Sequence, residues 1–355
     1  MTRIAIDAMG GDYAPRATVE GAVWAAVEHN IPIELVGKMY DVERELDAID
    51  LAGGFVVSGK GIQPDKKIKV DLSKLDIKKT NATEVIEMGE APGQAIRKKR
   101  NSSIVVSVNS VVSGSSDAVV AAGSTGAAMG ASLLGMGRLP GIERPAIATV
   151  LPTMKKPFIL IDSGANTNCS SQMLHQFGLM GAIYSKCIMG NENPRIALLN
   201  IGEEAGKGDE LAKETYKLFE ESKENLNFIG NVEGRDLFDG NCDVIVCDGF
   251  VGNVTLKTVE GAAKMLFYMI KREFKSDLLS TVIGLLSRPV LRRIYKKINY
   301  EEFGGALLLG VKGITVISHG GSSNYAIKNA VKLAYDAVET GINKKIAALY
   351  ESQEK

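Results

Sequence analysis

The chain has 355 residues, of which 45% are hydrophobic and 24% are charged, a composition typical of a globular protein with a sizeable core. The 42 Lys and Arg residues balance 42 Asp and Glu residues, so the overall charge gives no indication of a nucleic-acid partner. Three histidines and four cysteines are scattered without metal-ligand spacing, so we predict no metal site.

The first predicted strand follows the first three residues directly, without the charged and apolar regions of a signal peptide. No apolar run approaches the ~20 residues that a membrane-spanning helix needs. Together with the sparse cysteines, these features favour a cytoplasmic protein.

Apolar runs typical of strands alternate with helical patterns along most of the chain, which predicts an α/β fold with a largely parallel sheet. We predict strands at residues 4–7, 33–37, 55–58, 118–122, 146–151, 158–162, 196–200, 227–230, 243–247 and 314–318. Helices are expected at residues 16–29, 91–100 and 323–350 and after residues 126, 169 and 208. Residues 59–83 are polar and lysine-rich, which predicts an exposed excursion. No linker or internal repeat divides the chain, so we expect a single domain over residues 1–355.

The clearest candidate site is the loop formed by Gly123, Ser124, Thr125 and Gly126. A strand pattern precedes this loop and a helical pattern follows it, an order that leaves backbone N–H groups at the helix start open to an anion. The two hydroxyls add donors, and the glycines permit close approach of the backbone. A tight strand-to-helix turn without a ligand is the alternative interpretation.

Other polar loops also follow predicted strands. They carry Asp7, Gly10, Gly11 and Asp12, then Asn166, then Gly202, Glu203 and Lys207, then Asp248 and Asn253, and finally His319. In open α/β sheets, ligands bind outside the carboxyl ends of the strands. We therefore predict that these loops and the loop at residues 123–126 share one cleft.

Seven motifs give the chain a resemblance to the PlsX family. They are residues 7–12 (DAMGGD), 123–126 (GSTG), 141–146 (GIERPA), 164–166 (GAN), 199–204 (LNIGEE), 231–236 (NVEGRD) and 248–254 (DGFVGNV). The resemblance implies a three-layer α/β fold related to isocitrate dehydrogenases and phosphotransacetylases. It also implies a homodimer, loosely attached to the inner face of the cell membrane. The implied activity is transfer of a long-chain fatty acyl group from acyl-carrier protein to inorganic phosphate, giving acyl phosphate for phospholipid synthesis.

The sequence departs from the family pattern at a few positions. The family usually has His where Tyr13 stands, Asn at Ser124 and Asp at Asn168, and the Gly-Gly-Ser-Ser that follows His319 also differs. Ser124 matters most, because it lies in the proposed phosphate loop, where it keeps a hydroxyl but loses an amide N–H₂.

In the implied reaction, a phosphate oxygen attacks a thioester carbonyl. Phosphate is already an anion near neutral pH and the leaving thiol has a pKa of about 8.5, so the main tasks are binding, alignment and stabilisation of the oxyanion. We assign Lys207 to the phosphate or the oxyanion, and Asn166 and Asn253 as donors to the carbonyl oxygen. Asp248 and Glu203 are expected to orient Lys207 or loop amides, and His319 is a secondary candidate for proton transfer.

Each of these roles has an alternative. Lys207 is also consistent with a surface lysine at a helix start, and the two asparagines with structural turn amides. A covalent mechanism through Cys169 or Ser124 is the alternative to direct attack, since a cysteine near a helix start favours the thiolate. Three other functions compete: a short-chain phosphotransacetylase, a non-enzymatic membrane scaffold that binds acyl-carrier protein, and a nicotinamide dehydrogenase. The last lacks a strand-linked G-x-G-x-x-G, so no cofactor is expected.

Residues 275–300 form the candidate for a protruding amphipathic helical hairpin. Pro289 is expected to interrupt it, and Arg and Lys residues lie around the interruption. A helical hairpin with apolar faces and a basic collar fits an anionic membrane surface. The apolar residues assigned to the membrane are Leu278, Leu279, Val282, Ile283, Leu286, Leu291 and Ile294. A core or dimer-interface hairpin is the alternative.

Overall fold

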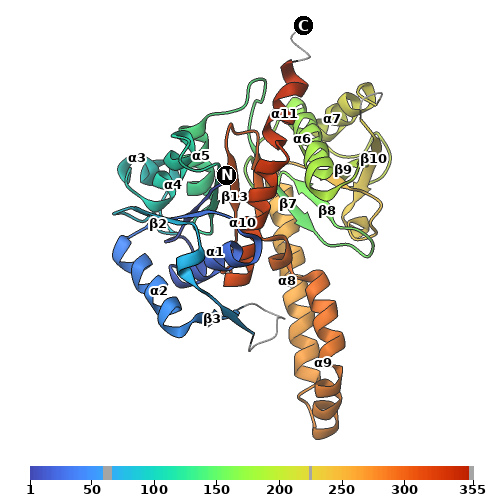
Figure 1. Ribbon diagram of the computed structural model, residues 1–355. Coiled ribbons are helices and arrows are strands. Elements are labelled where there is room, and N and C mark those ends of the chain that lie inside the picture. The colour runs from blue at the N-terminus through green and yellow to red at the C-terminus, as the bar shows by residue number, and fades with distance from the viewer. Residues whose placement is uncertain (59–65, 224–225, 352–355) are drawn as a thin grey trace.

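The computed structural model describes residues 1–58, 66–223 and 226–351 (Figure 1). Within these residues, 11 strands form one sheet in the order β10-β9-β11-β8-β7-β12-β13-β6-β1-β2-β5. Their bounds are β1 Ile4–Asp7, β2 Ile33–Gly37, β5 Ile77–Asn81, β6 Ala118–Ala121, β7 Ala146–Leu151, β8 Phe158–Ile161, β9 Ile196–Asn200, β10 Phe228–Glu233, β11 Val244–Val246, β12 Ala306–Leu309 and β13 Ile314–Ile317. A separate antiparallel pair is formed by β3 (Gly54–Val56) and β4 (Lys67–Lys69).

The sheet reverses direction in its middle. Strands β5, β2, β1, β6 and β13 are parallel to one another, and so are β8, β11, β9 and β10. Between these two parts, β12 is antiparallel to both β13 and β7, and β7 is antiparallel to β8. The predicted α/β fold with a largely parallel sheet is confirmed, but the two parts of the sheet run in opposite directions, which the strand pattern did not predict.

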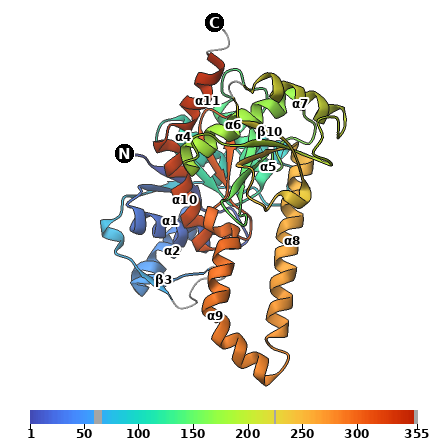
Figure 2. The ribbon, with the colours of Figure 1, turned by 90° about the vertical axis from the view of Figure 1, so that its right-hand side faces the viewer.

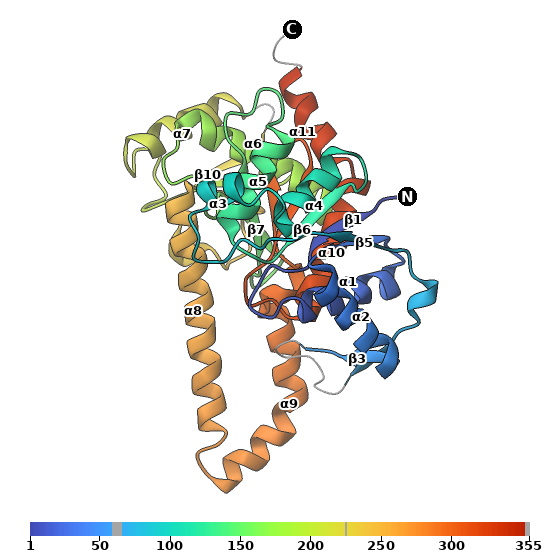
Figure 3. The same cartoon turned by 90° about the vertical axis from the view of Figure 1, so that its left-hand side faces the viewer.

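Helices cover both faces of the sheet, which gives three layers (Figures 1 and 3). One face is covered by α1 (Arg16–His29), α2 (Met39–Ala52), α6 (Ser171–Met189), α7 (Glu210–Glu221), α10 (Asn324–Glu339) and α11 (Ile342–Glu351). The other face carries α3 (Pro92–Lys98), α4 (Ser103–Val112), α5 (Thr125–Met136) and the first turns of α8 (Gly249–Glu273). Short 3₁₀ turns complete the chain at η1 (Leu72–Lys74), η2 (Gly234–Asp236) and η3 (Tyr300–Phe303).

The cores on the two faces differ. Under α1, α6 and α10 one cluster of buried side chains runs across both parts of the sheet. On the opposite face there are two separate clusters, one under α4 and α5 and one under α8. Side chains of a strand alternate between faces, so Ile147, Thr149 and Leu151 of β7 share the second face. Ile147 belongs to the first of these clusters and Leu151 to the second, so the core of this face is interrupted at Thr149.

The hairpin differs from the prediction. Residues 278–298 form one helix, α9 (Leu278–Ile298), with Pro289 inside it, and the other arm is α8. The two arms project from the body and are joined by a turn at residues 274–277 (Figure 2). Proline removes one backbone hydrogen bond and bends a helix without necessarily ending it, and α9 does change direction along its length (Figure 2). The hairpin therefore spans two long helices, and residues 275–300 contain only its second arm.

Two other predictions need correction, and one strand was missed. Part of the predicted excursion at residues 59–83 is β5, which pairs with β2 at the edge of the main sheet, while residues 59–65 lie outside the described residues. Strand β12 was not predicted. The helix expected at residues 323–350 is divided into α10 and α11 at Gly341, whose φ of +63° is unfavourable for other residues.

Candidate functional site

The start of α5 lies against the loops that follow β1 and β13. Gly10 approaches Gly123 so closely that a Cβ on Gly10 would stand 2.8 Å from the backbone nitrogen of Gly123. The backbone N–H of Asp12 donates to the carbonyl of Gly320 at 2.8 Å, and the exposed His319 accepts from the N–H of Gly321 through Nδ1. The predicted loops at residues 7–12 and 123–126 and the His319 loop are thus neighbours.

Ser124 is the N-cap of α5. Its hydroxyl oxygen accepts from the N–H of Ala127 at 3.4 Å, and Thr125 is the first helical residue, with an exposed side chain. Asparagine caps helices as well as serine does, so the departure from the family at Ser124 preserves the cap. The first N–H groups of a helix have no partner within it, so those of Thr125 and Gly126 are available for an anion.

Asp7 lies directly beneath this loop and is 4% exposed. Burial raises the pKa of its carboxyl group to about 6, although hydrogen bonds from Ser103, Met9 and Gly10 oppose the shift. Near neutral pH this carboxyl group is therefore close to its own titration point, next to the proposed anion site.

The loop after β8 is organised by a buried carboxylate, Asp162. Its Oδ1 accepts from the backbone N–H groups of Ile147, Gly164 and Ala165 at 2.9–3.1 Å, and its Oδ2 accepts from the backbone and side-chain N–H of Asn166 at 2.7 and 2.9 Å. Burial raises the pKa of Asp162 while these donors oppose the shift. Asp162 shapes this loop, and we did not single it out from the sequence, although its position after a strand is a usable signal.

Asn166 does not have the role that we predicted. Both hydrogens of its side-chain amide are used within the protein, one by Asp162 and one by the carbonyl of Pro145 at 2.8 Å. Its own backbone carbonyl accepts from the N–H of Gly249 at 2.7 Å, which connects this loop to the start of α8. Asn166 therefore joins two loops, and its amide is not placed to donate to a substrate carbonyl.

The start of α8 packs tightly on the Asp162 loop. Asp248 is the N-cap, and its Oδ1 accepts from the N–H groups of Phe250 and Val251. A Cβ on Gly252 would stand 1.9 Å from the carbonyl oxygen of Asp162, so only glycine fits there. The Asn253 side chain donates to the carbonyl of Ser163 at 3.3 Å. Asp248 thus caps α8 through two backbone amides, and its predicted orienting role and that of Asn253 as a donor stay predictions.

Gly202, Glu203 and Lys207 form a third group, in the loop after β9. The backbone of Lys207 holds this loop together: its N–H donates to Glu204 and its carbonyl accepts from Asn200. The side chains of Lys207 and Glu203 are exposed, and Gly202 is buried. Because β11 separates β9 from β8, this group lies beside the Asp162 loop and away from α5.

That all these loops share one cleft stays a prediction. The two parts of the sheet run in opposite directions but are offset: Ile317 of β13 pairs with Ala306, the adjacent Leu307 pairs with Ala148, and Ala148 pairs with Ile161 of β8. The carboxyl ends of β13 and β8 therefore lie at nearly the same level along the sheet. In addition, α5 and α8 both cover the second face, on either side of the interruption at Thr149. There the hydroxyls of Thr149 and Ser163 are hydrogen-bonded at 2.6 Å. The interrupted face is therefore where the two groups can meet a common ligand.

The cysteines are poorly suited to nucleophilic catalysis. Burial and the nearby charge of Asp162 raise the pKa of Cys169 to about 12, and burial raises the pKa of Cys247. The thiolate is the reactive form, so the predicted activation of Cys169 by a helix start is not supported. Direct attack by phosphate is favoured over an acyl-cysteine.

The apolar residues assigned to the membrane are exposed on α9. Leu278 and Leu286 are 83% and 76% exposed, and Leu279, Val282, Ile283 and Ile294 are also exposed, whereas Leu291 faces a cavity between the arms. Residues 249–298 contain ten Lys and Arg but three Asp and Glu. None of the described helices is both long enough and apolar enough to span a membrane.

The sheet order and its helices define the fold of the phosphotransacetylases. A phosphotransacetylase from Streptococcus pyogenes aligns with 95% of this chain and 94% of its own, with a TM-score of 0.58 and 16% identity. The EutD phosphotransacetylase from Staphylococcus aureus aligns over 94% of both chains, with a TM-score of 0.57 and 14% identity. At these identities the similarity establishes the fold alone.

Sequence comparison identifies the family. A family profile described as "Fatty acid synthesis protein" matches residues 2–345. A protein named phosphate acyltransferase from Dictyoglomus thermophilum is 48% identical over 97% of this chain and 96% of its own length. Another of the same name from Halothermothrix orenii is 44% identical over 99% and 98%. The chain therefore belongs to this family, the PlsX family that its motifs indicate.

Proposed function

We propose that the protein transfers a long-chain fatty acyl group from acyl-carrier protein to inorganic phosphate, giving acyl phosphate for phospholipid synthesis. The observation that carries this proposal is the match of nearly the whole chain to a fatty acid synthesis family whose relatives are named phosphate acyltransferase. The open helix start at Thr125 and Gly126 supports it, because it is suited to an inorganic anion.

In the proposed reaction, phosphate bound at the start of α5 attacks the thioester carbon. A C–O bond forms, the tetrahedral intermediate collapses, and the C–S bond breaks to release the thiol of the carrier after it takes up a proton. Asn253 is the proposed donor to the oxyanion, and Lys207 stays a candidate cation because its side chain is exposed. Asp162, Asn166 and Asp248 act as positioning residues that fix the start of α8.

An assay of the purified protein with palmitoyl-acyl-carrier protein and phosphate tests this function. Hydroxylamine converts acyl phosphate to a hydroxamate, which we expect to form only when phosphate and the thioester are both present. Product from acetyl-CoA but not from palmitoyl-carrier would instead indicate a short-chain phosphotransacetylase. If no thioester gave a hydroxamate, the protein would not be an acyltransferase, and the non-enzymatic scaffold would be favoured.

We further infer that the α8–α9 hairpin attaches the protein to the inner, anionic face of the membrane. The exposed apolar residues of α9 and the excess of basic residues along both arms support this attachment, because burial of apolar side chains and attraction to anionic lipids add together. The proposed product is a long-chain acyl phosphate, which is poorly soluble in water, so release at a membrane is favourable. We also propose a homodimer, which light scattering of the purified protein tests.

A further inference from the structure

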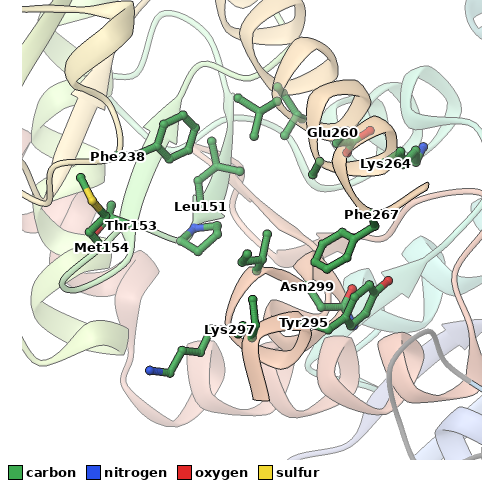
Figure 4. Close-up of a pocket in the computed structure, with 16 residues that line it drawn as sticks. Leu151, Thr153, Met154, Phe238, Glu260, Lys264, Phe267, Tyr295, Lys297 and Asn299 are labelled. Atoms are coloured by element: carbon green, nitrogen blue, oxygen red, sulfur yellow. The ribbon is translucent and has the colours of Figure 1, made fainter. Parts of the chain in front are cut away.

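A cavity of about 670 Å³ lies at the base of the hairpin, enclosed by α8, the end of α9 and the turn between β7 and β8 (Figure 4). Its size is within the range of small-molecule sites. The wall is largely apolar, and its members include Leu151, Phe238, Leu256, Val259, Phe267 and Ile298. No residue that we assigned from the sequence, other than Ile294, lines it.

This cavity adjoins the interrupted face of the sheet. Leu256 lies three residues after Asn253, so the two are about one helical turn apart on α8. Leu151 lies two residues after Thr149 on the same face of β7, a rise of about 7 Å. The cavity therefore begins next to the position proposed for the thioester carbonyl.

The cavity also opens toward the exposed arms of the hairpin. The rings of Phe267 and Tyr295 contact each other across the two arms, with their centroids 4.9 Å apart. Both residues line the cavity on the side of the hairpin (Figure 4). Both rings also line a second cavity, which follows the seam between α8 and α9 past Leu285 and Leu291. An apolar path thus connects the neighbourhood of Asn253 with the surface proposed to contact the membrane.

Two polar groups of the cavity wall are hydrogen-bonded within the protein. The Thr153 hydroxyl donates to the carbonyl of Lys156 at 2.7 Å, and the side chain of Asn299 is hydrogen-bonded to Glu301. Glu260, Lys264 and Lys297 add charged groups, but most of the other lining residues are apolar, which favours a hydrocarbon chain as the occupant.

We propose that this cavity binds the fatty acyl chain of the substrate, with the thioester end toward Asn253 and the methyl end toward the hairpin. The choice of a thioester substrate rests on the proposed function. The hydrocarbon subsite itself rests on the cavity. Each methylene that enters it should strengthen binding by up to about fourfold, until the cavity is filled.

Two neighbouring alanines on α8 allow a matched test. Ala263 lines the cavity, whereas Ala262 is exposed and does not line it. We expect Ala263→Trp to lower kcat/KM for palmitoyl-carrier at least about tenfold while leaving butyryl-carrier unchanged, and Ala262→Trp to leave both unchanged. Equal effects of the two variants, or equal losses for both chain lengths in Ala263→Trp, would overturn the subsite.

A binding measurement separates this subsite from the reaction. Palmitate with a terminal diazirine is photo-crosslinked to the wild-type protein, and the modified peptides are mapped. Adducts on α8, on the end of α9 or on the β7–β8 turn support the subsite even if no acyl phosphate is formed, in which case only the proposed function fails. Adducts elsewhere overturn the subsite while leaving the proposed function intact.

Discussion

The starts of α5 and α8 flank the same interrupted face of the sheet but are constructed differently. At α5, two glycine loops meet with almost no side chain between them, and a single serine caps the helix. At α8, a buried carboxylate gathers five N–H donors from β7 and its own loop, and a second carboxylate caps the helix. The first start leaves backbone donors open, whereas the second uses its donors internally.

This difference indicates separate roles for the starts of α5 and α8. An open helix start is suited to a small anion that is exchanged at every turnover. A helix start that is fixed by internal hydrogen bonds is suited to anchoring a projecting helix. This is the situation of α8, which continues out of the body as the first arm of the hairpin (Figure 2). Predictions that weaken one start and spare the other test this division.

The largest effect is expected at Asp162. Asp162→Ala leaves five donors without their acceptor in a buried loop, which should lower the free energy of unfolding by about 3–5 kcal/mol. Urea denaturation measures this loss. Asp162→Asn keeps one carbonyl oxygen for three of the donors, so its loss should be smaller. An alanine variant as stable as the wild type would mean that the loop does not depend on its carboxylate.

The exposed arms are expected to matter for membrane binding, and Ile294 also lines the proposed acyl cavity. Leu286→Glu combined with Ile294→Glu removes two apolar contacts, and each is worth about 1.5–3 kcal/mol when buried, so binding to anionic vesicles should fall roughly a hundredfold or more. Vesicle co-sedimentation measures it. Tyr40→Glu combined with Leu51→Glu, at exposed apolar positions of α2 on the body, is the matched control and should still bind. Similar binding by both double variants would refute the attachment through α9.

Much of the fold was predictable from local patterns. The strands β6, β7 and β9 and the helix α1 are close to their predicted bounds, because an alternation of buried strands and amphipathic helices is a local signal. The reversal between β7 and β8 was not predictable in this way, because strand direction depends on pairing between distant segments. The offset between the two parts, which brings the carboxyl ends of β13 and β8 to nearly the same level, depends on the same distant pairing.

The candidate site was predictable in its residue types more than in its contacts. Asp7, Ser124 and Asp248 were chosen because they follow strands, and each proves to support a loop or cap a helix. Asn166 was chosen for its amide, but which partners an amide binds depends on the folded loop. Thr149 and Ser163 carry no sequence signal of their own, because an isolated hydroxyl in an apolar run is common.

Asp7 should make folding stability depend on pH. Its pKa is about 6 in the folded protein and about 4 in an unfolded chain, so the folded state binds the extra proton between these values and stability falls as the pH rises through them. The total change is roughly 3 kcal/mol. Urea denaturation at pH 4 to 8 measures it, and Asp7→Asn should flatten the profile. Asp12→Asn removes the same charge from an exposed position of the same loop and is the control. If the wild type became more stable relative to Asp7→Asn between pH 4 and pH 6, the raised pKa of the buried Asp7 carboxyl group would be refuted.

The smallest effect is expected at Lys207, and it tests whether the α8 side of the site takes part in catalysis. It lies on the α8 side of the interrupted face, in the loop after β9, and its ammonium is exposed. If this cation stabilises phosphate or the oxyanion, Lys207→Ala should lower kcat/KM at least roughly tenfold, which corresponds to about 1.4 kcal/mol of transition-state stabilisation, and Lys207→Arg should recover part of it. Lys213→Ala, in α7, is the control for a nearby lost charge. Unchanged turnover in Lys207→Ala would mean that the start of α5 binds the phosphate without help from this lysine. The α8 side would then only position the substrate and contact the acyl carbonyl.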